Sequence, residues 1–119
     1  MARNVKSASG LSRRKCRPCR PGSRPLSDGR VREYLGKLNG WDREGGKISR
    51  RFRFKDYGQV AAFVNAVAWI AQAEDHHPDV EFGTRTCRVS YSTHAAGGLT
   101  ENDFICAAKI DLIYGNPKT

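Results

Sequence analysis

Residues 56–74 constrain the fold more than any other stretch, because apolar side chains recur there at the spacing of one helix face. Asp56 is a typical N-cap residue, and Pro78 forces the chain out of helical geometry shortly after Glu74. Asn65 and Gln72 interrupt the apolar stretch, which is too short and too polar to cross a bilayer. The pattern therefore predicts one long helix whose apolar stripe covers a sheet. That stripe comprises Val60, Phe63, Val64, Val67, Ile70 and Ala71.

Strand patterns precede and follow this helix. Cys87, Val89 and Tyr91 alternate with polar residues, which is typical of a sheet that is covered on one face. The glycine pair 45–46 predicts a tight turn with positive φ angles between two strands. His94 should lie at the end of the last strand, on its uncovered face. In chain order, we expect a helix over 27–38 ended by Gly40, strands over 41–44 and 47–54, the long helix, strands over 80–82 and 85–93, and a helix that begins at Thr100.

These elements predict an α+β domain in the order α-β-β-α-β-β-α. Its four-stranded, mostly antiparallel sheet should have all three helices packed on one face. A chain of 119 residues has room for one domain, and its 39% hydrophobic and 28% charged content fits a soluble globular protein. We assign the domain to residues 26–115 and a short C-terminal tail to residues 116–119.

Basic charge is concentrated at the N-terminus. Residues 1–25 hold eight basic residues and no acidic one, so they account for +8 of the net charge of +9. Because they offer little apolar surface, their composition predicts a disordered arm. A contact with an acidic partner and an organelle transit segment are two further interpretations. The nearly neutral domain shows no basic, aromatic-rich surface, which disfavours nucleic acid as a partner.

A Cys-x-x-Cys pair, Cys16 and Cys19, lies within this basic arm. Such a pair can supply half of a tetrahedral zinc site or act as a redox pair. Cys87 and Cys106 fall in a predicted strand and a predicted helix, where we interpret them as small buried hydrophobic residues. Since the arm contains no second cysteine pair, a monomer cannot close a four-cysteine zinc site there.

All three histidines of the chain lie in two short motifs, His76-His77-Pro78-Asp79 and Ser92-Thr93-His94. Histidine has an ordinary pKa of about 6.5, so it can give or take a proton near neutral pH. The cluster therefore indicates acid-base chemistry or metal ligation. Adjacent histidines point in different directions, and the sequence lacks the His-x-His or His-x₃-His spacing of paired ligands, so we expect no metal.

Motifs across the domain carry a family resemblance. The matching pieces are Gly40-Trp41, Phe54-Lys55-Asp56, Phe63-Val64-Asn65, the two histidine motifs, Gly97-Gly98-Leu99-Thr100, Asp103-Phe104 and Ala107-Ala108-Lys109-Ile110. Through these pieces, the segment from about Leu26 to Leu112 resembles the pterin-4a-carbinolamine dehydratases. Enzymes of that family dehydrate the 4a-hydroxytetrahydropterin that aromatic amino-acid hydroxylases leave, and they use no metal or other cofactor.

The resemblance implies a set of functional residues. His76 and His94 would act as general acids beside the 4a-hydroxyl group of the pterin. The pterin would be held by His77, Pro78, Ser92, Thr93 and Asp103. Asp103 would orient a histidine or a pterin group, and Thr100-x-x-Asp103 also has the form of a helix capping box, so both interpretations stay open.

Two positions depart from the family pattern. Gln72 stands four residues before the first histidine, where the family usually has an ionisable residue, and glutamine cannot titrate. Thr84 stands ten residues before the last histidine, where the family usually has an aromatic residue, and threonine cannot stack on a pterin.

The resemblance also implies partners and an alternative function. One branch of the family has degraded motifs and assists RuBisCO assembly in carboxysome-bearing bacteria and in chloroplasts, so a catalytically inactive assembly factor is the alternative. Some animal relatives bind a dimeric DNA-binding factor, and nothing in this sequence points specifically to that role. Family members form dimers and tetramers, which implies a homo-oligomer here. We expect a cytoplasmic enzyme of tetrahydrobiopterin recycling, or a carboxysome-associated or organellar protein under the alternative.

Overall fold

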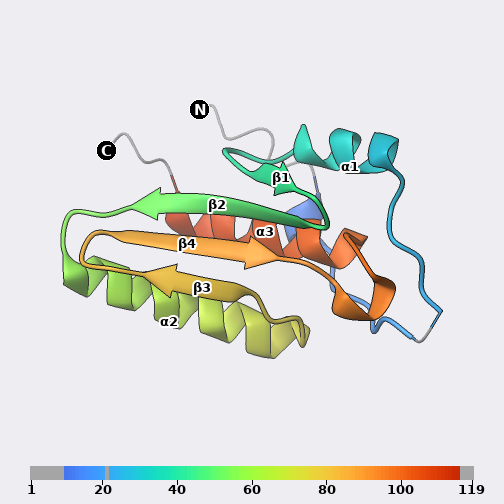
Figure 1. The fold of residues 1–119 in the computed structure, drawn as a ribbon. Coiled ribbons are helices and arrows are strands. Elements are labelled where there is room, and N and C mark those ends of the chain that lie inside the picture. The colour runs from blue at the N-terminus through green and yellow to red at the C-terminus, as the bar shows by residue number, and fades with distance from the viewer. Residues whose placement is uncertain (1–9, 21, 116–119) are drawn as a thin grey trace.

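The computed structural model describes residues 10–20 and 22–115 of the chain (Figure 1). Within these residues, helices and strands follow the predicted order, which confirms the α+β fold. The elements are a short 3-10 helix η2 (Leu11–Arg13), α1 (Asp28–Leu35), β1 (Asp42–Glu44), β2 (Lys47–Arg53), α2 (Tyr57–Glu74), β3 (Asp79–Phe82), β4 (Thr86–Tyr91), a second 3-10 helix η3 (His94–Ala96) and α3 (Glu101–Tyr114).

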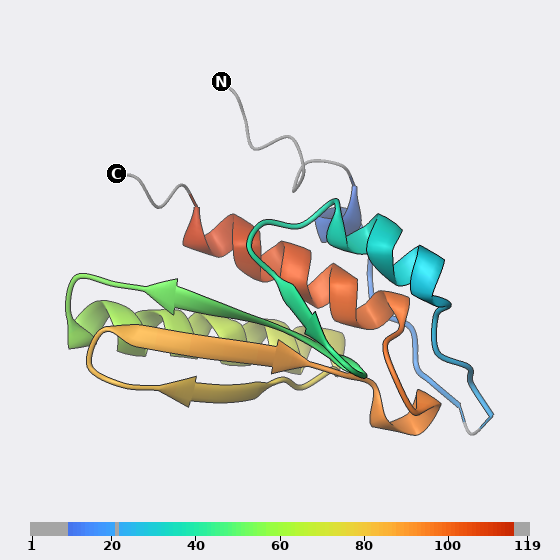
Figure 2. The same cartoon turned by 45° about the horizontal axis from the view of Figure 1, so that its top comes forward.

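The four strands form one antiparallel sheet in the order β1-β2-β4-β3. In the central pair, Ile48 of β2 lies opposite Tyr91 of β4, and Phe52 lies opposite Cys87. Helices α2 and α3 lie behind the sheet (Figure 1), and α1 lies beside α3 (Figure 2). This arrangement brings the end of α2, the end of β4 and the start of α3 together at one end of the molecule (Figure 1).

The core lies between the sheet and the helices. The predicted alternation holds, since every second residue of β4 is fully buried. Asp56 caps α2 as predicted, because its side chain accepts a hydrogen bond from the Gln59 N–H at 2.9 Å. The fully buried side chains of the central strands and the helices that cover them include Ile48, Phe52, Cys87, Val89, Tyr91, Val60, Phe104 and Ile110.

Arg50 is a charged exception on the core face of β2. Its Nη1 lies 2.6 Å from Oδ1 of Asp111, which is buried in α3. The same oxygen accepts a hydrogen bond from Trp41 Nε1 at 2.8 Å, and the other oxygen accepts one from the Asn39 N–H at 3.2 Å. The guanidinium also lies over the ring of Phe52. A satisfied ion pair therefore replaces an apolar contact between β2 and α3.

Some predicted boundaries differ from the structure. Helix α1 ends at Leu35 and continues to Leu38 only as turns. Of the two turn glycines at 45–46, only Gly45 has a positive φ. His94 does not end a strand, because β4 ends at Tyr91 and Thr93 pairs with Gly98 to close a loop that contains η3. The loop closed by Thr93 and Gly98 thus shortens β4 relative to the prediction.

Residues 10–20, here called the N-terminal segment, pack against the domain. Leu11 is only 1% exposed and joins the core. Lys109 Nζ donates a hydrogen bond to the carbonyl oxygen of Ser12 at 2.8 Å, and Arg14 pairs with Glu101. The expectation of a disordered arm over residues 1–25 is therefore wrong for this segment, because it makes specific contacts with α3 that composition does not reveal. Residues 1–9, 21 and 116–119 lie outside the described residues. No helix in the described part of the chain is both long and apolar enough to span a membrane.

Candidate active site

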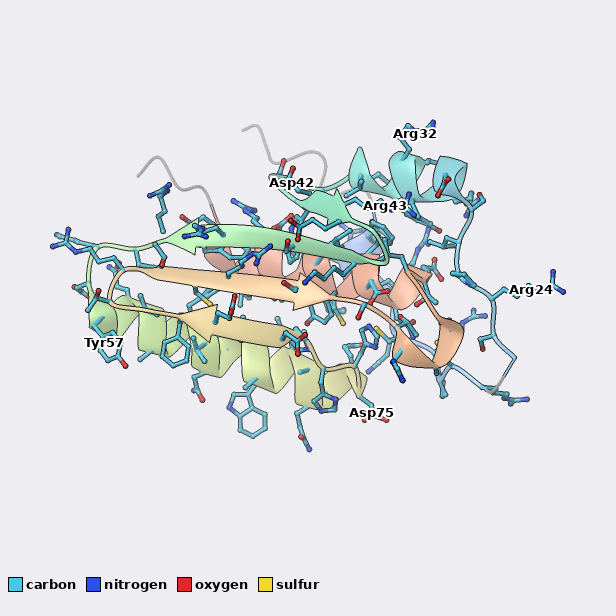
Figure 3. All side chains as sticks on the ribbon, viewed as in Figure 1. Arg24, Arg32, Asp42, Arg43, Tyr57 and Asp75 are labelled. Atoms are coloured by element: carbon cyan, nitrogen blue, oxygen red, sulfur yellow. The ribbon has the colours of Figure 1, made fainter. Side chains whose placement is uncertain are left out.

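The first histidine motif begins where α2 ends. Asp75 adopts a left-handed conformation with φ of 52°, which stops the helix after Glu74. The His76 N–H still bonds to the carbonyl oxygen of Ala71 at 3.2 Å, so the turn holds His76 close to the helix. Tyr57 and Asp75 mark the two ends of α2 in Figure 3. The helix end therefore fixes the position from which His76 extends.

His76 is oriented by contacts on two sides. Its Nε2 lies 2.6 Å from Oδ1 of Asp103, and the two side chains are 12% and 0% exposed. Its ring stacks on Tyr91, with centroids 5.5 Å apart and an angle of 6° between the planes. Because Asp103 belongs to α3 and Tyr91 ends β4, the imidazole connects three elements at this end of the fold.

Asp103 fulfils both interpretations that the sequence left open. Its Oδ2 accepts hydrogen bonds from the Thr100 N–H at 2.9 Å and from the Thr93 hydroxyl at 2.8 Å. The first of these bonds belongs to a capping box at the start of α3. The other carboxylate oxygen, Oδ1, is the one that contacts Nε2 of His76. One buried carboxylate thus caps a helix and orients a histidine.

The surroundings of His76 shift its proton affinity. Burial is the largest influence and by itself lowers the pKa of His76, but the hydrogen bond and the negative charge of Asp103 outweigh it. The net effect raises the pKa of His76 above the ordinary value of 6.5. A larger fraction of the His76 imidazole is therefore protonated near neutral pH than in an ordinary histidine.

A pocket of about 520 Å³ brings the candidate residues together. Five of the seven predicted site residues line it, from the end of α2 and from the loop after β4: His76, His77, Ser92, Thr93 and His94. Asp103 lies behind this lining, where it is hydrogen-bonded to the lining residues His76 and Thr93. Pro78 is not part of the lining. His77 and His94 are exposed, whereas the His76 side chain is largely buried.

The two departures from the family pattern lie away from this pocket. Gln72 is exposed on α2 and is not part of the lining. Thr84 follows Phe82, whose ring lies 6.5 Å from that of Tyr57 at the start of α2, so it sits at the opposite end of the sheet from His76. Thr84 is therefore remote from the pocket that the histidines line.

Sequence reasoning missed the pocket wall that the N-terminal segment supplies. Cys16, Arg17, Pro18 and Cys19 all line the pocket. Asn102 holds this stretch: its Oδ1 accepts from the Arg17 N–H at 3.0 Å, and its Nδ2 donates to the Arg17 carbonyl oxygen at 2.6 Å. No local pattern indicates this contact, because 85 residues separate the two partners.

Glu74 and the cysteines complete that wall. Glu74 Oε1 accepts a hydrogen bond from the Cys16 N–H at 2.8 Å, and its Oε2 lies 3.7 Å from Lys109 Nζ. The Cys16 and Cys106 sulfurs lie 3.5 Å apart. Cys87 and Cys106 are buried, as predicted. Among the described residues, no group of three or more His, Cys, Asp or Glu side chains is arranged to hold a metal ion.

Comparison of the chain with known sequences identifies its relatives. The family model described as pterin 4 alpha carbinolamine dehydratase matches residues 24–113. A protein from Nitrosospira multiformis is 51% identical over 87% of this chain and 92% of its own length. One from Nitrosomonas eutropha is 54% identical with the same coverage of both chains. Both relatives carry the provisional name pterin-4-alpha-carbinolamine dehydratase.

Two solved structures share the fold. A transcriptional coactivator/pterin dehydratase from Brucella melitensis matches with a TM-score of 0.74 and 32% identity, over 76% of this chain and 99% of that chain. A pterin dehydratase-like protein, described as a RuBisCO assembly factor in the alpha-carboxysome, matches with a TM-score of 0.57 and 27% identity, over 66% of this chain and 93% of that chain. The first likeness is the stronger in both geometry and sequence.

Proposed function

The chain belongs to the pterin-4a-carbinolamine dehydratase family, and we propose on that basis that it converts a 4a-hydroxytetrahydropterin to quinonoid dihydropterin and water. One observation carries the proposal: a single pocket is lined by all three histidines of the chain. One of the three is hydrogen-bonded to a fully buried carboxylate. The pocket volume of about 520 Å³ falls within the range of small-molecule sites.

The chemistry needs two proton transfers. The bond between C4a and the hydroxyl oxygen breaks while a proton is delivered to that oxygen, and another proton leaves a ring nitrogen. We assign these transfers to His76 and His94, since both line the pocket and imidazoles titrate near neutral pH. Asp103 favours the protonated form of His76, which suits that residue for proton delivery. Each such transfer contributes a factor of about 10²–10⁴ in rate.

The remaining lining residues would position the pterin. His77 and Ser92 are exposed toward the pocket, and the loop from Thr93 to Gly98 is closed by backbone pairing. A planar, polar ring needs hydrogen-bonding groups of this kind at its edge to fix its orientation. Substitution of His77 by alanine should therefore raise KM more than it lowers kcat.

The direct test is dehydration of chemically generated 4a-hydroxytetrahydropterin, followed by absorbance. We expect acceleration by the wild type and a loss of about 10²–10⁴ in kcat for His76→Ala and for His94→Ala. Thr84→Ala is the matched control, because that residue lies outside the pocket. If both histidine variants, checked for native circular dichroism, retain wild-type turnover, the proposal is wrong.

A second candidate function follows from the likeness to the alpha-carboxysome protein. Under this alternative the chain would bind RuBisCO during assembly and would not need proton transfer at the pocket. Binding to RuBisCO that survives His94→Ala, in a protein that does not accelerate dehydration, would favour this candidate. The weaker likeness in geometry and sequence makes it the second choice.

We further infer that the chain acts as a homo-oligomer in the cytoplasm, within pterin recycling. Exposed aromatic side chains support self-association: Tyr57 and Trp69 on α2 and Phe82 on β3. Strand β3 also lies at the sheet edge, where unpaired backbone groups favour pairing with another chain. Sedimentation equilibrium at micromolar concentration tests whether the chain self-associates, and a monomer alone would overturn the homo-oligomer.

A further inference from the structure

Two thiols that are distant in sequence meet beside the pocket. The sulfurs of Cys16 and Cys106 lie 3.5 Å apart, although 90 residues separate the two cysteines. Cys106 is fully buried in α3, and Cys16 is half-buried in the N-terminal segment, where it lines the pocket. A disulfide needs the sulfurs at about 2.05 Å, so they must approach by roughly 1.5 Å.

The position of Cys16 is fixed by its neighbours. Its N–H donates to Glu74, and the next residue, Arg17, is held through both backbone groups by Asn102. Asn102 also lies next to Cys19, with Nδ2 at 3.7 Å from the Cys19 sulfur. The structure therefore directs Cys16 toward Cys106 and places Cys19 against Asn102 instead.

We propose that Cys16 and Cys106 form a reversible disulfide that fastens the N-terminal segment to α3 at the wall of the pocket. Hydrogen peroxide or a related peroxide is the oxidant. One sulfur, as a thiolate, attacks a peroxide oxygen, which breaks the O–O bond, gives a sulfenic acid and releases hydroxide. The second sulfur displaces the sulfenic hydroxyl and forms the S–S bond. The two thiol protons convert both hydroxides to water, and the peroxide is reduced by two electrons.

The environment of the pair favours this reaction. A hydrogen bond from the Cys16 thiol is the largest influence on Cys106 and lowers its pKa, and the nearby charge of His76 acts in the same direction. Cys87 provides the contrast, because burial raises its pKa to about 11. The same hydrogen bond, together with burial, raises the pKa of Cys16, so Cys106 is the member of the pair that favours the thiolate. Since the thiolate is the reactive species, Cys106 should react first, Cys16 should then complete the disulfide, and Cys87 should not react.

Peptide mapping can identify the disulfide without any measurement of turnover, so its failure is separate from failure of the proposed function. Trypsin does not cleave before proline, which keeps Cys16 and Cys19 in one peptide, 16–30. Cys106 falls in peptide 89–109 and Cys87 in peptide 86–88. After treatment of the full chain with stoichiometric hydrogen peroxide and alkylation, we expect peptides 16–30 and 89–109 to be linked, and the link to disappear after reduction.

Two variants assign the link to one cysteine of the N-terminal segment. Cys19→Ser should retain the link, and Cys16→Ser should abolish it. A disulfide within peptide 16–30, a link lost in Cys19→Ser but kept in Cys16→Ser, or thiols that stay unlinked would each overturn the proposal.

Thermal unfolding gives a second readout. The disulfide would close a loop of about 90 residues, so the oxidised wild type should melt at least about 5 °C above the reduced protein. Cys16→Ser should show no such shift. An oxidised wild type that melts at or below the reduced one would mean that the cross-link does not fit this fold.

Discussion

Nε2 of His76 lies 2.6 Å from Oδ1 of Asp103, a carboxylate that is wholly excluded from solvent. The same carboxylate accepts from the Thr100 N–H at the start of α3. The histidine that lines the pocket is thus joined through one side chain to a helix terminus. The contact between His76 and Asp103 should therefore affect both the stability of the protein and the pKa of His76.

The first prediction concerns pH. Since the pKa of His76 is raised in the folded protein, its contribution to stability is fully present below about pH 6.5 and is lost as pH rises through the folded value. His76→Gln should therefore lower the free energy of unfolding by about 1–3 kcal/mol near pH 6, and by less near pH 9. Urea unfolding at both pH values measures this difference.

Two comparisons accompany that measurement. His77→Gln changes an exposed histidine and should stay within about 0.5 kcal/mol at both pH values. In an NMR titration, Asp103→Asn should lower the pKa of His76. A stability difference for His76→Gln that grows with rising pH would contradict the assignment.

Much of the fold could be predicted because its signals are local. Asp56 caps α2 as its residue type suggested, and the alternation of Cys87, Val89 and Tyr91 identified the buried face of β4. The histidine motifs likewise indicated a cluster, and the residues after α2 and after β4 do line one pocket. Local patterns therefore located the centre of the pocket.

What could not be predicted depends on contacts between distant residues. Leu11 is one apolar side chain in a basic stretch, and only the surface of α3 makes it part of the core. The hydrogen bonds between Asn102 and Arg17, and the approach of Cys16 to Cys106, likewise join opposite ends of the chain. Composition reports the average polarity of a segment, whereas packing depends on a few of its side chains.

A second prediction addresses the buried ion pair. Arg50→Ala leaves the Asp111 carboxylate buried, with Trp41 and the Asn39 N–H as its remaining donors, and should cost about 3–5 kcal/mol near neutral pH. Arg51→Ala, at an exposed position of the same strand, should change stability by less than about 0.5 kcal/mol. Chemical denaturation of the two variants gives the comparison.

Acid should reduce the effect of Arg50→Ala. Burial raises the pKa of Asp111, while Trp41 and Arg50 oppose that rise. The raised pKa means that the fold favours the neutral form of the Asp111 carboxyl. This preference stabilises the folded protein below the unfolded pKa of about 3.9, and the stabilisation is lost as pH rises through the folded pKa. The loss of stability caused by Arg50→Ala should therefore be smaller near pH 4 than near pH 7. An equal loss at both values would show that the penalty comes from packing alone.

The third prediction concerns the loop that carries His94. A Cβ at Gly98 would lie 2.9 Å from Cβ of Pro25, so Gly98→Ala should cost about 1–3 kcal/mol through overpacking. Gly83→Ala is the matched control, because nothing lies within 4 Å of its added Cβ. Thermal melts should show a lower midpoint for Gly98→Ala only. Equal midpoints would mean that the two turns tolerate a methyl group equally.

The fourth prediction tests how firmly the N-terminal segment is anchored. Leu11→Ala removes a side chain that is 1% exposed and should cost about 2–4 kcal/mol. Leu112→Ala makes the same chemical change at a position that is 52% exposed, and should stay within about 0.5 kcal/mol. Urea midpoints of the two variants would settle the comparison, and similar small losses would show that Leu11 does not anchor the segment.

The residues that match the family begin at 24, whereas the wall of the pocket begins at Cys16. Two relatives can therefore hold the same histidines on the same domain and still offer differently shaped cavities to a ligand. The stretch that supplies this wall lies before the residues that the family model matches, although the Nitrosospira multiformis protein aligns with 87% of this chain and so with most of that stretch. A change in residues 16–19 would therefore alter the shape of the cavity while every residue that the family model matches stays the same.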